Sequence, residues 1–476
     1  MKRLLKWVFG LVGALLLLVL IAAAGAVLFI DPNDYRDTIA SKVEEQTGRE
    51  LSIAGEINLS LFPWLGLELG AMELGNAKGF GEKPMASIGA AEARVKLLPL
   101  LKLQTEIDTV LLRGLEVNLH RRADGVSNWD DLVKGGAEPA PEKEQPAEQG
   151  DPQKLEQILN ALAIGGIILE EANVEWRDDL NKQRFSLNHV NFSSGEIRIG
   201  KAIPMKLSTE LASSTPEVKG TLQFSANVAA DPMAQRFSAE GMTLSTSLSG
   251  NGLPGGALKA SLGGNAAVDL GAQQASLSGF RLNGMGAEVV AQLEVSKLLE
   301  QPDLQGRLTL KLADVAKLLT LAPAGSVPPE LKLTALNGTQ LDLNVDLSLG
   351  QQTVKLAPLT LATPGVELKL TANGKQILDK PRFNGELSSS EFVPRQLLGD
   401  LGIVLPEMAD PSAMGKAKLS TRFNGGLERV ALNKLVLRLD DTTVSGKASV
   451  ANFAAPVIRY TLKLDEIDVD RYLPPP

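Results

Sequence analysis

The chain has 476 residues, a formal net charge of −8, no cysteine and only 4% aromatic residues. Without cysteine it can form no disulfide, thiolate metal site or cysteine nucleophile. Its acidic balance argues against nucleic acid as a partner, because phosphate binding calls for a basic surface. At this length we expect several compact cores or an array of repeats.

The first part of the chain is a candidate membrane anchor. The segment Trp7–Ile30 has no charged residue, and as a helix it is long enough to cross a bilayer. Basic residues precede it and acidic residues follow it, which predicts a cytoplasmic N-terminus with the rest of the chain outside the cytoplasm. A cleaved signal peptide is the alternative, but this apolar stretch is longer than signal peptides use.

A short helix is expected directly after the anchor. Asp31 can act as its N-cap, Pro32 fits its first turn, and Gly48 can end it. Its apolar residues recur every four positions, at Tyr35, Ile39 and Val43. We expect this stripe to pack on the strands that follow, and contact with the membrane interface is the alternative.

From Leu51 onward apolar residues recur at every second position. In Leu341–Leu349, for example, leucine and valine alternate with Asp, Asn and Ser. This period is typical of antiparallel strands with one apolar and one wetted face. Alternation alone indicates burial against a second sheet, and an apolar face left open to a ligand is the alternative.

The chain divides at a segment rich in Pro, Glu and Gly. Residues 135–152 have no apolar period and are predicted to be a disordered linker. They separate an N-terminal unit, residues 31–134, from a larger region, residues 153–476.

The larger region contains three comparable copies, at about residues 258–325, 331–403 and 416–474. Each opens on a leucine-rich stretch, Leu277–Leu282, Leu356–Leu361 or Leu432–Leu437, and reaches a proline and a new strand 24 or 25 residues later. Short helices are expected at Asp314–Leu321 and Phe392–Leu401. The even spacing predicts a stacked array.

No pattern in the sequence points to catalysis. Residues 250–255 match G-x-G-x-x-G, but a strand-like stretch follows, so a turn is expected in place of a nucleotide site. His120 and His189 have no partner at metal-binding spacing. Adjacent carboxylates such as Asp440-Asp441 are expected in turns. We therefore expect no enzymatic activity, no metal and no cofactor.

Several segments together resemble the AsmA family of bacterial envelope proteins. Besides the N-terminal anchor, the resemblance rests on five stretches: FPWLGLELGAMELGNAKGFG (62–81), VKLLPLL (95–101), LRGLEVNLHRRADGVSNWDDL (112–132), NVEWRDD (173–179) and LDDTTVSGKASV (439–450). The last is followed by DVDRYLPP. None of these motifs is catalytic.

The resemblance implies a single-pass protein of the bacterial inner membrane with a periplasmic body. The implied fold is mainly β: a transmembrane helix followed by an elongated, curved antiparallel sheet of repeating β-groove units, with a few short helices. It resembles the chorein-type lipid-transfer proteins, so the open apolar face becomes the favoured alternative.

The implied function is passive transfer of phospholipid toward the outer membrane. Assistance to outer-membrane protein assembly, with an outer-membrane or periplasmic protein as partner, is the alternative. On the functional hypothesis the groove is lined by alternating apolar residues of the repeats: Leu308, Leu310, Leu312, Leu341, Leu343, Val345, Leu347, Leu368, Leu370, Leu435, Leu437 and Leu439.

Overall fold

The structure is a computed structural model that describes residues 31–60, 65–95, 106–134, 163–320 and 331–475. Of these residues, 58% lie in strands and 11% in helices, which confirms the mainly β fold class and the open antiparallel sheet. The chain forms two compact units. Unit 1 is Met1–Met233 with Ser247–Leu253, and unit 2 is Ala234–Thr246 with Pro254–Pro476. Strand β14 (Arg236–Ser249) contributes residues to both.

Two predicted segments lie outside the described residues, namely the anchor at residues 1–30 and the linker at 135–152. Both stay predictions. Among the helices that the structure does describe, none is long and apolar enough to cross a membrane.

The predicted helix after the anchor is present as η1 (Pro32–Tyr35) and α2 (Arg36–Thr47). The Asp31 side chain accepts a hydrogen bond from the Asn33 amide, and Gly48 ends α2 with a φ of +68°. The expected packing of its apolar stripe is wrong, since α2 buries none of its residues and Ile39 is exposed. Val43 of the stripe is half-buried, and α2 contacts β1 without enclosing any side chain.

The first strands of unit 1 form a short antiparallel meander. The strands of the whole unit are β1 (Leu51–Ile53), β2 (Ile57–Ser60), β3 (Leu65–Leu69), β4 (Met72–Leu74), β5 (Ala86–Ile88), β6 (Ala90–Val95), β7 (Glu106–Arg113), β8 (Glu116–Arg121), β9 (Ala163–Ile164), β10 (Ile167–Asp178), β11 (Gln183–Ser194), β12 (Ile203–Ser214) and β13 (Glu217–Asp231). The helix α4 (Asp130–Lys134) follows β8.

The sheet of unit 1 contains parallel pairings that the expectation of a purely antiparallel sheet did not include. Strand β10 pairs in parallel with β7 and then with β8 along one edge, and β7 also pairs in parallel with β9. Parallel neighbours need a long connection, and residues 122–166 separate β8 from β10 in the sequence. From β10 to β13 the pairing is antiparallel again.

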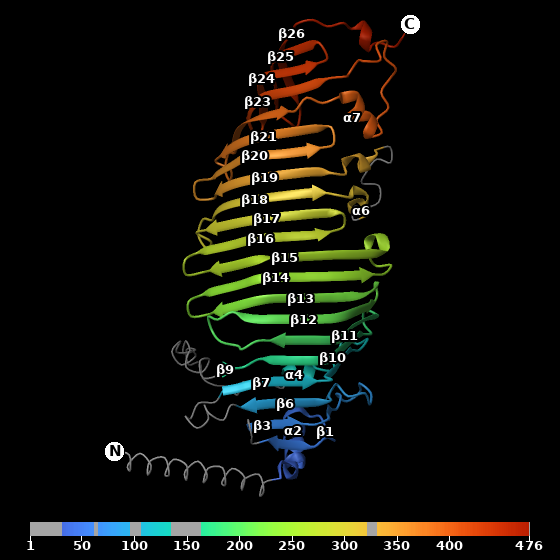
Figure 1. Cartoon of the computed structure of the whole chain (residues 1–476), viewed down its shortest axis with the longest axis vertical. Helices are drawn as coiled ribbons and strands as arrows, with labels where there is room; N and C mark the ends of the chain where they lie inside the picture. The colour runs from blue at the N-terminus through green and yellow to red at the C-terminus, as the bar shows by residue number, and fades with distance from the viewer. Residues whose placement is uncertain (1–30, 61–64, 96–105, 135–162, 321–330, 476) are drawn as a thin grey trace, which may run out of the picture. The chain divides into compact units, whose positions relative to one another are not determined.

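Unit 2 is an antiparallel meander in which each strand pairs with the next along the chain (Figure 1). Its strands are β15 (Ala257–Asp269), β16 (Gln274–Gly284), β17 (Ala287–Ser296), β18 (Asp303–Leu312), β19 (Thr339–Ser348), β20 (Thr353–Thr363), β21 (Val366–Lys375), β22 (Arg382–Ser389), β23 (Ala417–Gly426), β24 (Arg429–Leu439), β25 (Thr442–Ala451) and β26 (Val457–Leu464). The residues of each predicted copy thus contain four strands.

The two ends of these strands differ. At one end the connections are hairpin turns of two to six residues. At the other end the longer crossovers hold α6 (Val315–Leu319), η3 (Leu333–Leu336) and α7 (Pro394–Asp400), on the right in Figure 1. The helices predicted at Asp314–Leu321 and Phe392–Leu401 are confirmed, with the Asp314 side chain capping α6.

Gly385 in β22 lies where the neighbouring strands leave no room for a side chain. A Cβ at Gly385 would lie 2.0 Å from the Thr371 carbonyl oxygen and 2.6 Å from the Phe423 ring. We expect Gly385→Val to lower the free energy of unfolding by about 3 kcal/mol, at the upper end of overpacking costs. Thermal denaturation followed by circular dichroism measures this.

The matched control is Gly399→Ala in α7, where a Cβ would meet nothing within 4 Å. This substitution should be neutral or stabilise by about 0.5–1 kcal/mol, as Gly→Ala does in helices. Equal stability of the two variants would contradict the close strand approach at Gly385.

Candidate functional site: an apolar sheet face

All twelve leucine and valine residues predicted to line a groove lie on one face of unit 2. Residues directly opposite each other on paired strands point to the same face. One row across the sheet is Leu262, Leu282, Val289, Leu310, Leu341, Leu361, Leu368 and Ser389, and on later strands Leu419, Leu437, Val444 and Leu464. A second row is Phe280, Ala291, Leu308, Leu343, Leu359, Leu370 and Leu387. We call this surface the apolar face of unit 2.

The apolar face carries almost no polar side chains. Over the described strands β15–β26, Tyr460 is the one residue on it with an ionisable group. Its other polar residues are hydroxyl-bearing, at Thr339, Thr363, Ser389, Thr421 and Thr442. A surface this free of charge suits hydrocarbon and is unsuited to water.

The apolar face is not the interior of a closed core. All twelve predicted residues are half-buried, and none of the leucine, phenylalanine or tryptophan residues described in the structure is fully buried. The described strands of unit 2 form one continuous ladder, and an enclosed sandwich core would leave leucine side chains like these fully buried. Closed-sandwich burial, the first alternative from the sequence, is therefore wrong for these residues.

The opposite face of unit 2 is charged. Arg422 and Glu386 sit across from each other on β23 and β22, with 2.6 Å between Nε and Oε1. Arg281 and Glu288 are diagonal neighbours on β16 and β17 and approach to 3.4 Å. Such exposed pairs contribute about 0–1 kcal/mol each, so their effect is mainly to keep this face in water.

Bulges recur along the array at the stretches that open the three sequence copies. The ladder shifts register between Leu277 and Phe280, between Leu356 and Leu359, and between Leu432 and Leu435. Each bulge adds a residue to its strand, which bends the strand and increases its twist. The repeat seen in the sequence is therefore a repeat of bulges. A bulge depends on the backbone, so the three copies can share it although their side chains differ.

Side chains on the facing strand satisfy carbonyls that the bulges free. The Asn344 amide donates to the Pro358 carbonyl at 3.4 Å, and the Thr421 hydroxyl donates to the Asn433 carbonyl at 3.4 Å. In unit 1 the Thr209 hydroxyl does the same for Asn188 at 3.1 Å, beside a bulge in β11. These side chains bind backbone carbonyls that have no partner in the strand ladder. The sequence therefore stabilises the bulges by specific hydrogen bonds.

Unit 1 also has one apolar and one polar face. Val174, Leu187 and Leu211 form one cross-strand row, and Phe192, Leu207 and Phe224 form another. On the other face a depression of about 490 Å³ lies over β8, β10, β11 and β12. Its lining is polar for the most part and includes Lys83, Glu116, Asn118, Asn173, Glu175, Arg184, Ser186 and Asn188.

The charges in this depression neutralise one another. Lys83 Nζ lies 2.8 Å from Glu175 Oε2, and this hydrogen bond holds the pKa of Glu175 below its ordinary value. Arg184 and Glu116 add one charge of each sign to the lining. The depression therefore offers no net charge for an ionic ligand.

The two histidines and the Asp178-Asp179 pair contact separate partners. His120 Nε2 lies 2.8 Å from Asp179, whereas Asp178 binds Asn181 in the following turn. His189 is 60% exposed on a bulge. Adjacent carboxylates thus serve different partners, and in the part of the chain that the structure describes no group of acidic or histidine side chains could hold a metal ion.

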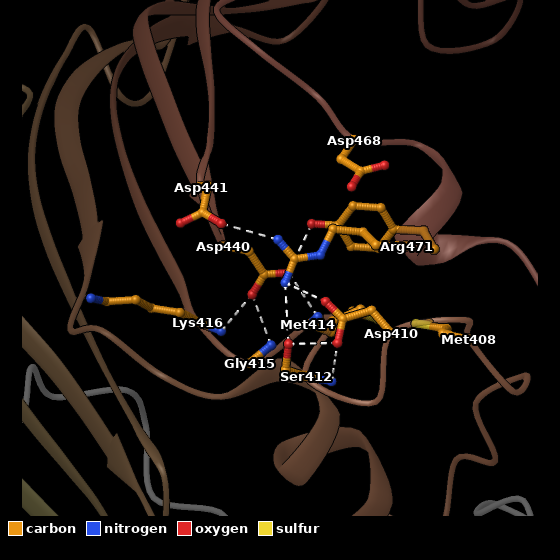
Figure 2. Close-up of polar contacts among 12 residues, drawn as sticks. Met408, Asp410, Ser412, Met414, Gly415, Lys416, Asp440, Asp441, Asp468 and Arg471 are labelled. Carbon is orange, nitrogen blue, oxygen red and sulfur yellow. Dashed lines mark hydrogen bonds and ion pairs between the residues drawn. The ribbon is translucent and has the colours of Figure 1, made fainter.

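A polar cluster that sequence reasoning missed lies at the crossover ends of the last strands (Figure 2). The Asp440 carboxylate accepts hydrogen bonds from the backbone amides of Met414, Gly415 and Lys416 at 2.8–3.0 Å. It also accepts one from the Tyr472 hydroxyl at 2.7 Å. Asp440 thereby joins the segment after α7, the β24–β25 turn and η4 (Asp470–Tyr472).

Arg471 closes the same cluster. Its guanidinium lies 2.9 Å from Asp410 and 3.1 Å from Asp441 (Figure 2). Backbone hydrogen bonds from Ala409 to Leu473 and from Asp410 to Arg471 run beside it. We call Asp410, Asp440, Asp441, Arg471 and Tyr472 the C-terminal polar cluster. Every one of these groups is engaged with another, so the cluster holds chain segments together.

Two pKa shifts follow from this geometry. Burial alone would raise the pKa of Asp440, but the Tyr472 hydroxyl and the three amides outweigh it and hold that pKa below the ordinary value. Burial, followed by the bond to Asp440, raises the pKa of Tyr472 to about 12.

A second missed contact lies in unit 1. The Arg49 side chain is fully buried and donates to the Asn128 carbonyl and to Asp131, both at 2.6 Å. No local pattern indicates this contact, because Arg49 and Asp131 are 82 positions apart. It fixes the residue before β1 to α4 and to the segment that precedes α4.

The sequence matches the family model of the AsmA family over residues 1–475. The chain belongs to the AsmA family. A curated relative, protein AsmA of Escherichia coli K12, is 32% identical over 117 residues, which are 24% of this chain and 19% of the relative. The aligned part is thus about a fifth of that AsmA protein's length. No solved structure matches the chain.

The pKa of Tyr472 leads to a prediction about alkaline pH. A raised pKa means that the neutral hydroxyl stabilises the fold fully below pH 10 and that this contribution is lost as the pH rises through about 12. Tyrosinate absorbance should contain a step near pH 12 that Tyr472→Phe removes. The same variant should lose about 1.5–3 kcal/mol of stability at pH 7, as expected for a hydrogen bond to a charged group.

Asp440 gives the acid side of the same test. Because its pKa is lowered, its contribution is present above the unfolded value of 3.8 and disappears as the pH falls through the folded value. Asp440→Asn should therefore flatten the acid limb of the stability curve. An unchanged alkaline step in Tyr472→Phe would contradict the assignment of Tyr472 to this cluster.

Proposed function

We propose that this AsmA-family chain binds the acyl chains of phospholipid on its apolar sheet faces and lets them move along the strand ladder. The observation that carries the proposal is the apolar face of unit 2, which has no acidic or basic side chain and no covering layer in the described strands. Family membership fits such a role in the envelope. On this proposal the chain is anchored in the inner membrane, its body is periplasmic, and it is not an enzyme.

Successive strands offer an acyl chain nearly equivalent positions. In the row through Leu310, Leu341 and Leu361 each strand presents one leucine, and neighbouring strands are about 4.8 Å apart. A ligand that moves by one strand exchanges one set of contacts for a similar set, so no deep free-energy minimum holds it in place. Passive sliding is the mechanism that this equivalence supports.

The binding strength expected from an open face is moderate. Removing a methylene from water is worth about 0.8 kcal/mol when it is fully covered. An open sheet covers one side of an acyl chain, so roughly half of that applies per methylene. The headgroup stays in water, and the charged opposite face contributes no contact to the tails.

The test compares one added charge on each face. We expect the full chain, extracted in detergent, to carry phospholipid that mass spectrometry detects, and Leu343→Asp to reduce the lipid per chain by fivefold or more. The matched control Asn373→Asp adds the same charge to the opposite face, where Asn373 is exposed and pairs with Lys355. It should leave the lipid content unchanged.

Circular dichroism of both variants distinguishes lost binding from lost folding. A half-buried leucine at the edge of water can be replaced without the large penalty of burying a lone charge in a closed core. If Leu343→Asp folds and retains all its lipid, the proposal is wrong. If wild type carries no phospholipid and crosslinks instead to porin precursors, the assembly alternative takes its place.

A further inference from the structure

Exposed apolar side chains mark the hairpin ends of unit 2. Leu299, Leu378, Leu427 and Phe453 lie in the turns β17–β18, β21–β22, β23–β24 and β25–β26, and they are 66%, 64%, 70% and 49% exposed. Hairpin turns are ordinarily built from Gly, Asn, Asp, Ser and Pro. Large apolar side chains at four such turns, all at the same end of the strands, therefore call for an explanation. We call these four residues the apolar turn row.

The strand order places the four residues in a line at defined intervals. Two turns separated by four strands lie about 19 Å apart, and those separated by two strands lie about 10 Å apart. The row thus runs from Leu299 to Leu378 over about 19 Å and then to Leu427 and Phe453 in steps of about 10 Å. Single side chains at such intervals form no contiguous patch of the kind that a folded protein partner buries. Fluid hydrocarbon can surround each of them separately.

The charges beside the row favour an uncharged or zwitterionic surface. The four connecting segments, residues 297–302, 376–381, 427–428 and 452–456, contain two lysines and three carboxylates. Lys297 is already paired with Asp303 at 2.7 Å. A surface that relied on anionic lipid would need more basic than acidic residues, and these segments have fewer.

The turn row adjoins the apolar face of unit 2. Val295 and Ala448 lie on that face close to the strand ends from which the turns with Leu299 and Phe453 start. The opposite strand ends differ, because the crossovers, their helices and the C-terminal polar cluster occupy them. The turns with Leu299 and Phe453 thus lie directly beside the apolar face, and a hydrocarbon layer that surrounds them would lie next to it.

We propose that the apolar turn row of Leu299, Leu378, Leu427 and Phe453 inserts into the surface of a zwitterionic phospholipid membrane and brings the hairpin edge of the apolar face to its acyl chains. The inference deepens the proposed function and rests on it for its purpose. It names the membrane surface as the partner of this edge and the side of the sheet by which lipid enters.

The experiment uses the absence of cysteine from the chain. Single variants Leu299→Cys, Leu378→Cys and Leu427→Cys are labelled with an environment-sensitive fluorophore, and the full chain is reconstituted into phosphatidylcholine vesicles with or without acyl-chain spin labels. The matched control is Val404→Cys, since Val404 is 92% exposed and lies on the crossover between β22 and β23, at the other strand ends. We expect the spin-labelled lipid to quench the three turn labels at least threefold more than the Val404 label, with little change between low and high salt.

Equal quenching at the turns and at Val404 would overturn the proposal. A second arm places the turn labels in the Leu343→Asp background. Quenching that persists there supports contact with the membrane surface, whereas quenching that disappears shows contact with lipid held on the face and overturns the proposal. Mass spectrometry of lipid in the same samples separates the two claims, because a chain that holds lipid without turn quenching refutes the inference alone.

Discussion

The architecture depends on keeping the side-chain alternation in phase from strand to strand. A slip of one residue would turn every leucine of a strand onto the charged face and every charged residue onto the apolar face. The ladder of unit 2 avoids this over all of β15–β26, including at bulges where an extra residue enters. Leu277 and Phe280 are three positions apart, yet each faces an apolar partner on β17. Of the two residues between them, Gly279 has a φ of +59°, and the extra residue of the bulge resets the phase.

The strands could be predicted from the sequence because a two-residue period is a local signal. The segment around Leu341–Leu349 is a strand for the reason that its alternation indicates, and Asp314 caps α6 as its residue type suggests. The opening stretches of the copies were visible as repeats, but their nature as bulges was not. A bulge is a relation between two strands, and one strand's sequence does not show which partner residue it skips.

Long-range polar contacts and element packing were beyond sequence reasoning. Asp440 was expected in a turn and is in one, but nothing local indicates that it binds the amides after α7 and the Tyr472 hydroxyl. The apolar stripe of α2 satisfies the helical period without being buried, because periodicity states which face is apolar and not what covers it. The parallel pairing of β10 was not predicted either. It depends on how the chain returns to β7 and β8, which the local period of β10 does not show.

The same limit applies to the apolar face itself, whose leucines the sequence identified while leaving open what covers them. The most direct measurement is photocrosslinking with a photoreactive phenylalanine at Leu310 and, as the comparison, at Lys311, its neighbour on the charged face. Mass spectrometry of the purified chain then identifies the adducts. We predict phospholipid adducts at Leu310 and none at Lys311. Adducts at neither position, or equally at both, would contradict an apolar face covered by lipid.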